Sequence, residues 1–190
     1  MSNEISKKES ALPVISAHAE GDGVAVGYAD SFAPTFNIFL PNGSCSASNP
    51  DYFNLIIGYD PFEKDHILVD PSRALTEYIS DEVKSQFGGW SSEAIEKIKK
   101  LPAIISCERD GTDGQQAVFA FIEDIKVQDN GIKVYFRRYF PMPFSFLSEN
   151  LSDLAMHMFE LTRTHWTIKK IDLMEVIQDA GVFPGGQYGK

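Results

Sequence analysis

The feature that most constrains this sequence is a pair of apolar, alternating segments joined by Asp129-Asn130-Gly131. The segments read AVFAFIEDIKVQ (residues 117–128) and IKVYFRRYF (residues 132–140). Both are rich in β-branched and aromatic side chains, which are typical of strands. Asn-Gly or Asp-Gly between two such runs favours the tight turn of an antiparallel pair. The sequence therefore predicts a long β-hairpin at the centre of the fold.

Shorter apolar runs bounded by turn residues predict further strands. Residues 43–51, GSCSASNPD, are small and polar and predict a loop. Two strands are expected within residues 13–30, around the turn EGDG. Further strands are expected at 35–40, at 52–59 before the stop at Asp60-Pro61, at 66–69 and at 103–110.

The hydrophobic period changes after Pro71. Leu75, Ile79, Val83 and Phe87 recur every fourth residue, which predicts one helix that begins near Pro71 and ends before Gly88-Gly89. Three more segments have helical patterns with candidate N-caps. They are residues 91–101 with Ser91 or Ser92, 148–161 with Ser148 or Asn150, and 171–181 with Asp172.

These elements together predict an α+β fold. We expect mixed or antiparallel strands, with the central hairpin in a small sheet or barrel, plus a helical pair and short C-terminal helices. The expected organisation is a disordered N-terminus (1–11), an α+β sub-domain (12–101), a hairpin and helical sub-domain (102–182) and a flexible tail (183–190).

Composition narrows the classes of function. The net charge of -10 disfavours non-specific binding to nucleic acid or anionic lipid, which requires clustered Lys and Arg. The N-terminal residues have no apolar signal region, and no apolar run reaches the length of a membrane span of about 18 residues. Cys45 and Cys107 are far apart and form no Cys-x-x-Cys pair. We therefore expect a cytoplasmic protein with no direct nucleic-acid or membrane partner.

Motifs for common chemistries are missing from the sequence. It contains no phosphate-binding glycine loop and no Gly-x-Ser-x-Gly nucleophile elbow. The histidines are not spaced as metal ligands, so we expect neither a metal site nor a cofactor. The densest group of titratable residues is the segment GYDPFEKDHILVDP, with Asp60, Glu63, Asp65 and His66. Two carboxylates there could act as acid and base in a small hydrolase, although a solvated loop is the simpler interpretation.

The stretch RTHWTIKK, Arg163–Lys170, gathers a guanidinium, an imidazole, an indole and two ammonium groups in an acidic chain. Its threonines favour an extended backbone. One interpretation makes it a wall of the core, with Trp166 buried and its indole N–H satisfied. In that case Arg163 pairs with Glu160 or Asp172, and His165 bonds a backbone carbonyl. In the other interpretation, the stretch is a recognition surface for an anion or an acidic partner, formed by Arg163, His165, Trp166 and Lys169.

The segment ELTRTHWTIKKIDLMEVI (residues 160–177), with PMPFSFL (141–147) upstream, resembles a C-terminal signature of uncharacterised bacterial proteins. The resemblance covers about a third of the chain and implies a setting near mobile elements or anti-phage loci, but it brings no catalytic residues. The first hypothesis is therefore a protein-binding or regulatory module in a defence or toxin-neutralising system, with a basic protein partner and without enzymatic activity. A small hydrolase and an acidic DNA mimic remain alternatives.

Overall fold

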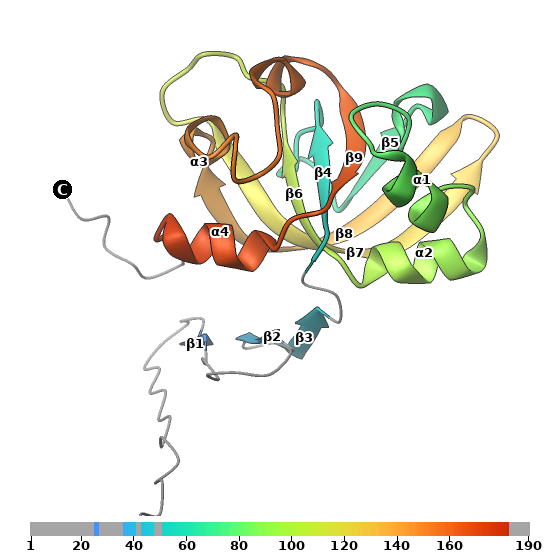
Figure 1. The fold of residues 1–190 in the computed structure, drawn as a ribbon, viewed down its shortest axis with the longest axis horizontal. Coiled ribbons are helices and arrows are strands. Elements are labelled where there is room, and N and C mark those ends of the chain that lie inside the picture. Colours follow the sequence, from blue (N-terminus) through green and yellow to red (C-terminus); the bar gives the residue numbers. More distant parts are fainter. Residues whose placement is uncertain (1–24, 27–35, 41–42, 48–50, 183–190) are drawn as a thin grey trace, which may run out of the picture.

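The computed structural model describes residues 25–26, 36–40, 43–47 and 51–182. The fold is α+β, as the sequence predicted, and it is built on a curled, mixed six-stranded sheet in the order β5-β8-β7-β6-β4-β9 (Figure 1). All neighbouring strands are antiparallel except β4 and β6. The six strands are β4 (Phe53–Ile57), β5 (His66–Val69), β6 (Pro102–Ser106), β7 (Gln116–Gln128), β8 (Gly131–Pro143) and β9 (His165–Lys169).

A second, three-stranded antiparallel sheet contains β1 (Ala25–Val26), β2 (Phe36–Leu40) and β3 (Gly43–Ala47). The prediction of a loop over residues 43–51 was wrong at its start, because residues 43–47 pair with β2 along their whole length. The other strand expected within residues 13–30, the N-terminus (1–11) and the tail (183–190) lie outside the described residues.

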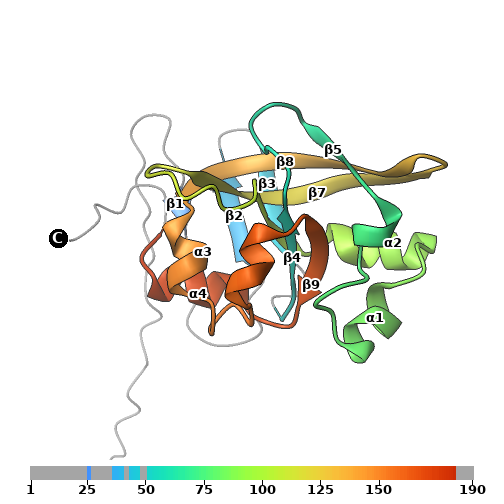
Figure 2. The ribbon, with the colours of Figure 1, turned by 90° about the horizontal axis from the view of Figure 1, so that it is seen from above.

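The predicted hairpin is confirmed and is the longest element of the sheet. Gln128 pairs with Gly131, so Asp129 and Asn130 form a two-residue turn. Two register shifts, at Phe119/Ala120 and at Ile122/Asp124, interrupt the pairing of β7 and β8. Such bulges increase the local twist of a strand pair. They accompany the bend of the hairpin that Figures 1 and 2 show.

The helix predicted from Pro71 is wrong over its first half. The helix α1 spans only Asp81–Phe87, after a short 3-10 turn at Pro71–Arg73, and Leu75 and Tyr78 have φ values of 54° in the left-handed region. The backbone N–H of Leu75 donates to the carbonyl of Trp166, and Ala74 bridges to Trp166. The edge of β9 therefore holds the start of this segment, and residues 75–78 follow a bent, non-helical path.

The remaining helices begin and end close to their predicted limits. Helix α2 (Ser92–Lys99) is capped by Ser91, and α4 (Leu173–Asp179) is capped by Asp172. Residues 148–161 are only partly helical, as expected. They contain the end of α3 (Ser145–Glu149), which has no side-chain cap, and most of a 3-10 turn, η2 (Met158–Thr162).

Each face of the large sheet carries its own hydrophobic cluster. Strand β4 contributes to both, because its side chains alternate between the faces. Leu55 packs with α3 and α4, and Ile56 packs with α1 and α2. Figures 1 and 2 show these two helix pairs at opposite ends of the sheet.

The six-stranded sheet crosses the boundary that we proposed between residues 12–101 and 102–182. Strand β4, from the first part, lies between β6 and β9 from the second. The two parts therefore share a sheet and both hydrophobic clusters. Among the described residues, no helix is long and apolar enough to cross a membrane.

Candidate functional site

The stretch Arg163–Lys170 is mostly the edge strand β9, which pairs antiparallel with β4. Its side chains alternate, as expected of an extended chain. Trp166 and Ile168 belong to the cluster that contains α1 and α2. His165 and Lys169 point to the opposite face, where the 3-10 turn η2 covers the strand.

Trp166 is a core residue. Its side chain is fully buried, and its indole N–H donates to Asn54 Oδ1 at 3.1 Å. The ring lies 5.3 Å from the ring of Trp90. The expectation of a buried indole with a satisfied N–H is confirmed.

His165, Glu160 and Lys169 form a buried polar cluster. Lys169 Nζ lies 2.8 Å from Glu160 Oε2, and His165 Nε2 lies 3.6 Å from the same oxygen. His165 Nδ1 is 2.7 Å from the carbonyl oxygen of Arg163, as one of the two interpretations expected. Because a carbonyl oxygen only accepts, Nδ1 carries the proton and Nε2 faces the carboxylate.

Local structure turns Glu160 inward. The other carboxylate oxygen, Oε1, accepts from the backbone N–H of His157 at 2.8 Å, which fixes Glu160 within the turn η2. Burial raises the pKa of Glu160, but the contacts with His165 and Lys169 outweigh it and hold the pKa below its usual value. Glu160 is therefore a buried carboxylate that stays charged because a cation accompanies it.

Arg163 lies outside this cluster and pairs with Glu77, not with Glu160 or Asp172. Its Nε and Nη2 donate to the two oxygens of Glu77 at 2.6 and 2.7 Å. Arg73 donates to the same carboxylate at 3.0 and 3.2 Å. Hydrogen bonding to Arg163 lowers the pKa of Glu77. This bidentate pair ties the end of η2 to the segment before α1.

The four residues of the predicted recognition surface therefore do not share one exposed surface. Arg163 is exposed and already paired, His165 and Trp166 are fully buried, and Lys169 is 7% exposed. A binding role for Arg163, His165, Trp166 and Lys169 stays a prediction, and Lys169 alone of the three buried members lines a pocket among those described.

The acidic segment proposed for a hydrolase forms an exposed loop before β5. Asp60 accepts from the backbone N–H of Phe62, and Asp65 lies 2.8 Å from His66 Nδ1. Glu63 pairs with its neighbour Lys64 at 3.4 Å. Arg138 Nη1 donates to the carbonyl of Pro61 at 2.7 Å and holds the loop against the hairpin. These contacts are typical of a structured surface loop, while the catalytic role proposed for Asp60, Glu63, Asp65 and His66 stays a prediction.

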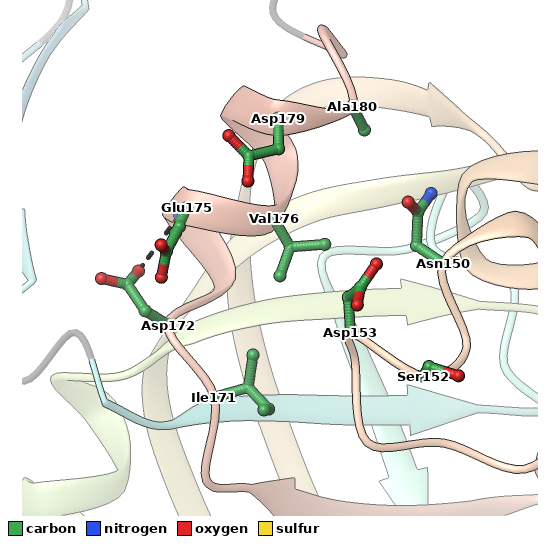
Figure 3. Close-up of a pocket in the computed structure, with 9 residues that line it drawn as sticks. All are labelled: Asn150, Ser152, Asp153, Ile171, Asp172, Glu175, Val176, Asp179 and Ala180. Carbon is green, nitrogen blue, oxygen red and sulfur yellow. Dashed lines mark hydrogen bonds between the residues drawn. The ribbon is translucent and has the colours of Figure 1, made fainter.

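A different group of carboxylates lies on a groove of about 660 Å³ between α4 and residues 150–153. Figure 3 shows Val176 between the helix and the loop that carries Asn150 and Asp153. The lining contains four carboxylates and no basic side chain. It is formed by Asn150, Ser152, Asp153, Ile171, Asp172, Glu175, Val176, Asp179 and Ala180.

Three of these carboxylates are available to a ligand. Asp172 accepts from the backbone N–H groups of Met174 and Glu175 as the cap of α4. Within the part of the chain that the structure describes, Asp153, Glu175 and Asp179 form no ion pair, and all three are exposed. The groove thus combines an apolar floor with unpaired negative charge.

This groove was not predicted from the sequence. The acids of α4 recur at spacings of three and four, which places them near one another on a helix, and this signal was visible. Asp153 comes from a separate segment, so its position opposite α4 required the tertiary fold. Among the described residues, no group of three His, Cys, Asp or Glu side chains could hold a metal ion.

Comparisons of the chain with known protein families, with curated proteins and with solved structures found no match.

Proposed function

We propose that this chain is a non-enzymatic protein-binding module, and that the groove between α4 and residues 150–153 binds a basic segment of its partner. The observation that carries the proposal is the acidic groove with its apolar floor (Figure 3). Protein interfaces commonly combine an apolar centre with a polar rim. Val176 and Ile171 supply apolar surface here, and Asp153, Glu175 and Asp179 supply the charged rim.

The charge of the whole chain supports the same kind of partner. A net charge of -10 attracts a basic protein over distances longer than a contact, and unpaired carboxylates at the groove then select its orientation. The resemblance of residues 160–177 to bacterial proteins near anti-phage loci supports a cytoplasmic role in a defence or toxin-neutralising system. A basic surface on a toxin or nuclease is the class of partner that fits this chemistry.

The proposal is tested with a fluorescently labelled peptide that alternates lysine with alanine, titrated with the protein while anisotropy is measured. The groove variant Asp153→Asn, Glu175→Gln, Asp179→Asn removes three charges. The control variant Glu63→Gln, Asp113→Asn, Asp129→Asn removes three charges from other exposed positions. We expect the groove variant to bind at least about tenfold more weakly than the wild type, a change of about 1.4 kcal/mol in binding free energy.

The control variant separates local recognition from general attraction. If both variants lose the same affinity, the peptide responds to net charge alone and the groove is not the binding site. If the groove variant loses this affinity and the control variant binds within about twofold of the wild type, the groove is supported as the binding site.

A further inference from the structure

A second pocket, of about 330 Å³, lies beside the buried polar cluster and on the other side of β9 from Trp166. Residues 78–80 form one wall, and residues of the 155–160 segment form the other. Glu160 and Lys169 line what we call the polar end of the pocket. The pocket shares no lining residue with the groove at α4.

Two residues of this pocket have a strained backbone. Tyr78 has φ 54° and Ala155 has φ 52°, in the left-handed region that side chains other than glycine rarely adopt. Such conformations concentrate at binding and catalytic sites, where the surrounding structure holds them in place. Here Thr167 Oγ1 and Lys169 Nζ both donate to the carbonyl oxygen of Tyr78, at 3.0 and 3.4 Å.

The polar end of the pocket has unused hydrogen-bonding capacity. Lys169 carries three donors. Its described contacts are Glu160 Oε2 at 2.8 Å, the long bond to the Tyr78 carbonyl, and the Tyr78 ring, whose centroid lies 6.0 Å from Nζ. Glu160 Oε2 is already paired with Lys169 Nζ at 2.8 Å, so the capacity that remains at this end of the pocket is a donor of Lys169. Buried donors are normally paired, so this end of the pocket suits a ligand that supplies an oxygen acceptor to Lys169.

Two of the side chains that line the pocket, Tyr78 and His157, carry rings, and both rings contact that of Phe159. The rings of Tyr78 and Phe159 meet edge to face at 5.4 Å, and His157 stacks on Phe159 at 5.6 Å with an interplanar angle of 4°. Phe159 is 55% exposed, and its neighbour Met158 is 43% exposed. Aromatic and apolar walls around a small number of polar groups are typical of sites for small organic molecules.

The charge of the polar end limits the class of ligand. Glu160 and Lys169 neutralise one another, so a negatively charged ligand at Lys169 would be repelled by the nearby carboxylate. A neutral oxygen acceptor meets no such repulsion. We propose that this pocket binds a small planar molecule with a neutral amide or lactam carbonyl, which accepts a hydrogen bond from Lys169 Nζ while its ring packs against Tyr78 and His157. This site is independent of the function proposed for the groove.

Benzamide and benzoate are matched probes, because they share a ring and differ in the charge of the group that meets Lys169. Each is titrated into ¹⁵N-labelled protein. We expect benzamide to cause saturable shifts of the backbone amides of Tyr78, Ser80, Ala155 and Lys169, and benzoate to bind at least about tenfold more weakly. No saturable shift with benzamide overturns the proposal, as does benzoate binding that is equal or tighter.

Variants test the contact itself. Glu160→Gln with Lys169→Met removes both charges together and leaves no unpaired ion, and it should abolish the benzamide shifts. Lys170→Met is the control, because Lys170 is exposed and pairs with Glu82 at 2.8 Å; it should bind benzamide as the wild type does. Unchanged binding by the double variant overturns the proposal. If the double variant does not fold, the comparison of benzamide with benzoate on the wild type decides it.

Discussion

Two regions of this molecule use carboxylates in opposite ways. Glu160 belongs to η2, and its side chain is fully buried, with Lys169 at 2.8 Å and His165 at 3.6 Å. Glu175 and Asp179 are exposed on α4, and within the described residues neither forms an ion pair. The buried carboxylate holds parts of the fold together, whereas the exposed ones make no described ion pair and can meet a partner.

The difference shows how environment decides the role of the same chemical group. A charge taken out of water destabilises the fold unless a close partner compensates it, so Glu160 requires Lys169. An exposed charge is already solvated, so its removal has little effect on folding. Stability experiments should therefore respond to the buried region, and binding experiments to the groove.

The largest expected effect is that of Lys169→Met. The substitution leaves Glu160 buried without its cation, and breaking such a pair typically costs about 3–5 kcal/mol of unfolding free energy. Urea denaturation followed by circular dichroism measures this loss. The double variant Glu160→Gln, Lys169→Met removes both charges and should recover at least about half of it.

Lys170→Met is the matched control for this experiment. Lys170 follows Lys169 in the chain, but its ion pair with Glu82 is exposed. The unfolding free energy lost by Lys170→Met should be a small fraction of that lost by Lys169→Met. Equal losses for the two lysines would show that Glu160 is not held by Lys169 as the structure indicates.

Low pH should reduce the unfolding free energy of the wild type, because Glu160 becomes protonated. Since the pKa of Glu160 is lowered in the folded state, its contribution to stability is fully present above the ordinary Glu pKa and is lost as the pH falls through the lowered value. Unfolding free energies from about pH 6 down to about pH 3 should therefore fall more steeply for the wild type than for Glu160→Gln, Lys169→Met. Parallel curves for the two proteins would contradict this role of Glu160.

A smaller effect is expected of Arg163→Ala. Arg163 is 46% exposed at its side chain, and Arg73 remains to hold Glu77 after the substitution. The loss of unfolding free energy should be less than about a quarter of that of Lys169→Met, and high salt should reduce it. A loss as large as that of Lys169→Met would mean that the exposed pair, not the buried one, holds η2 in place.

Local chemistry allowed much of the fold to be predicted from the sequence. The turn at Asp129-Asn130, the cap Ser91 and the cap Asp172 act within a few residues, and the elements that they begin or connect were predicted correctly. The segment before α1 was not, although its apolar residue Leu75 is buried as its spacing suggested. There the edge of β9, far along the chain, competes with helix formation for the backbone of Leu75.

The candidate sites were less predictable for the same reason. The partners expected for Arg163 were Glu160 and Asp172, which are close to it in sequence. The partner in the structure is Glu77, 86 residues away. The groove likewise joins Asp153 to α4 from a separate segment. Contacts between distant segments carry no signal in a single sequence, whereas caps and turns do.

The most direct test of the proposed function is to locate the bound basic peptide. ¹⁵N-labelled protein is titrated with the unlabelled lysine–alanine peptide, and the shift of each backbone amide is recorded. We predict that the largest shifts lie in Glu175–Ala180 and in residues 150–153, and that they disappear in the variant Asp153→Asn, Glu175→Gln, Asp179→Asn. Shifts spread evenly over the acidic surface, or centred on the loop of Asp60 and Asp65, would contradict the proposal that the groove is the binding site.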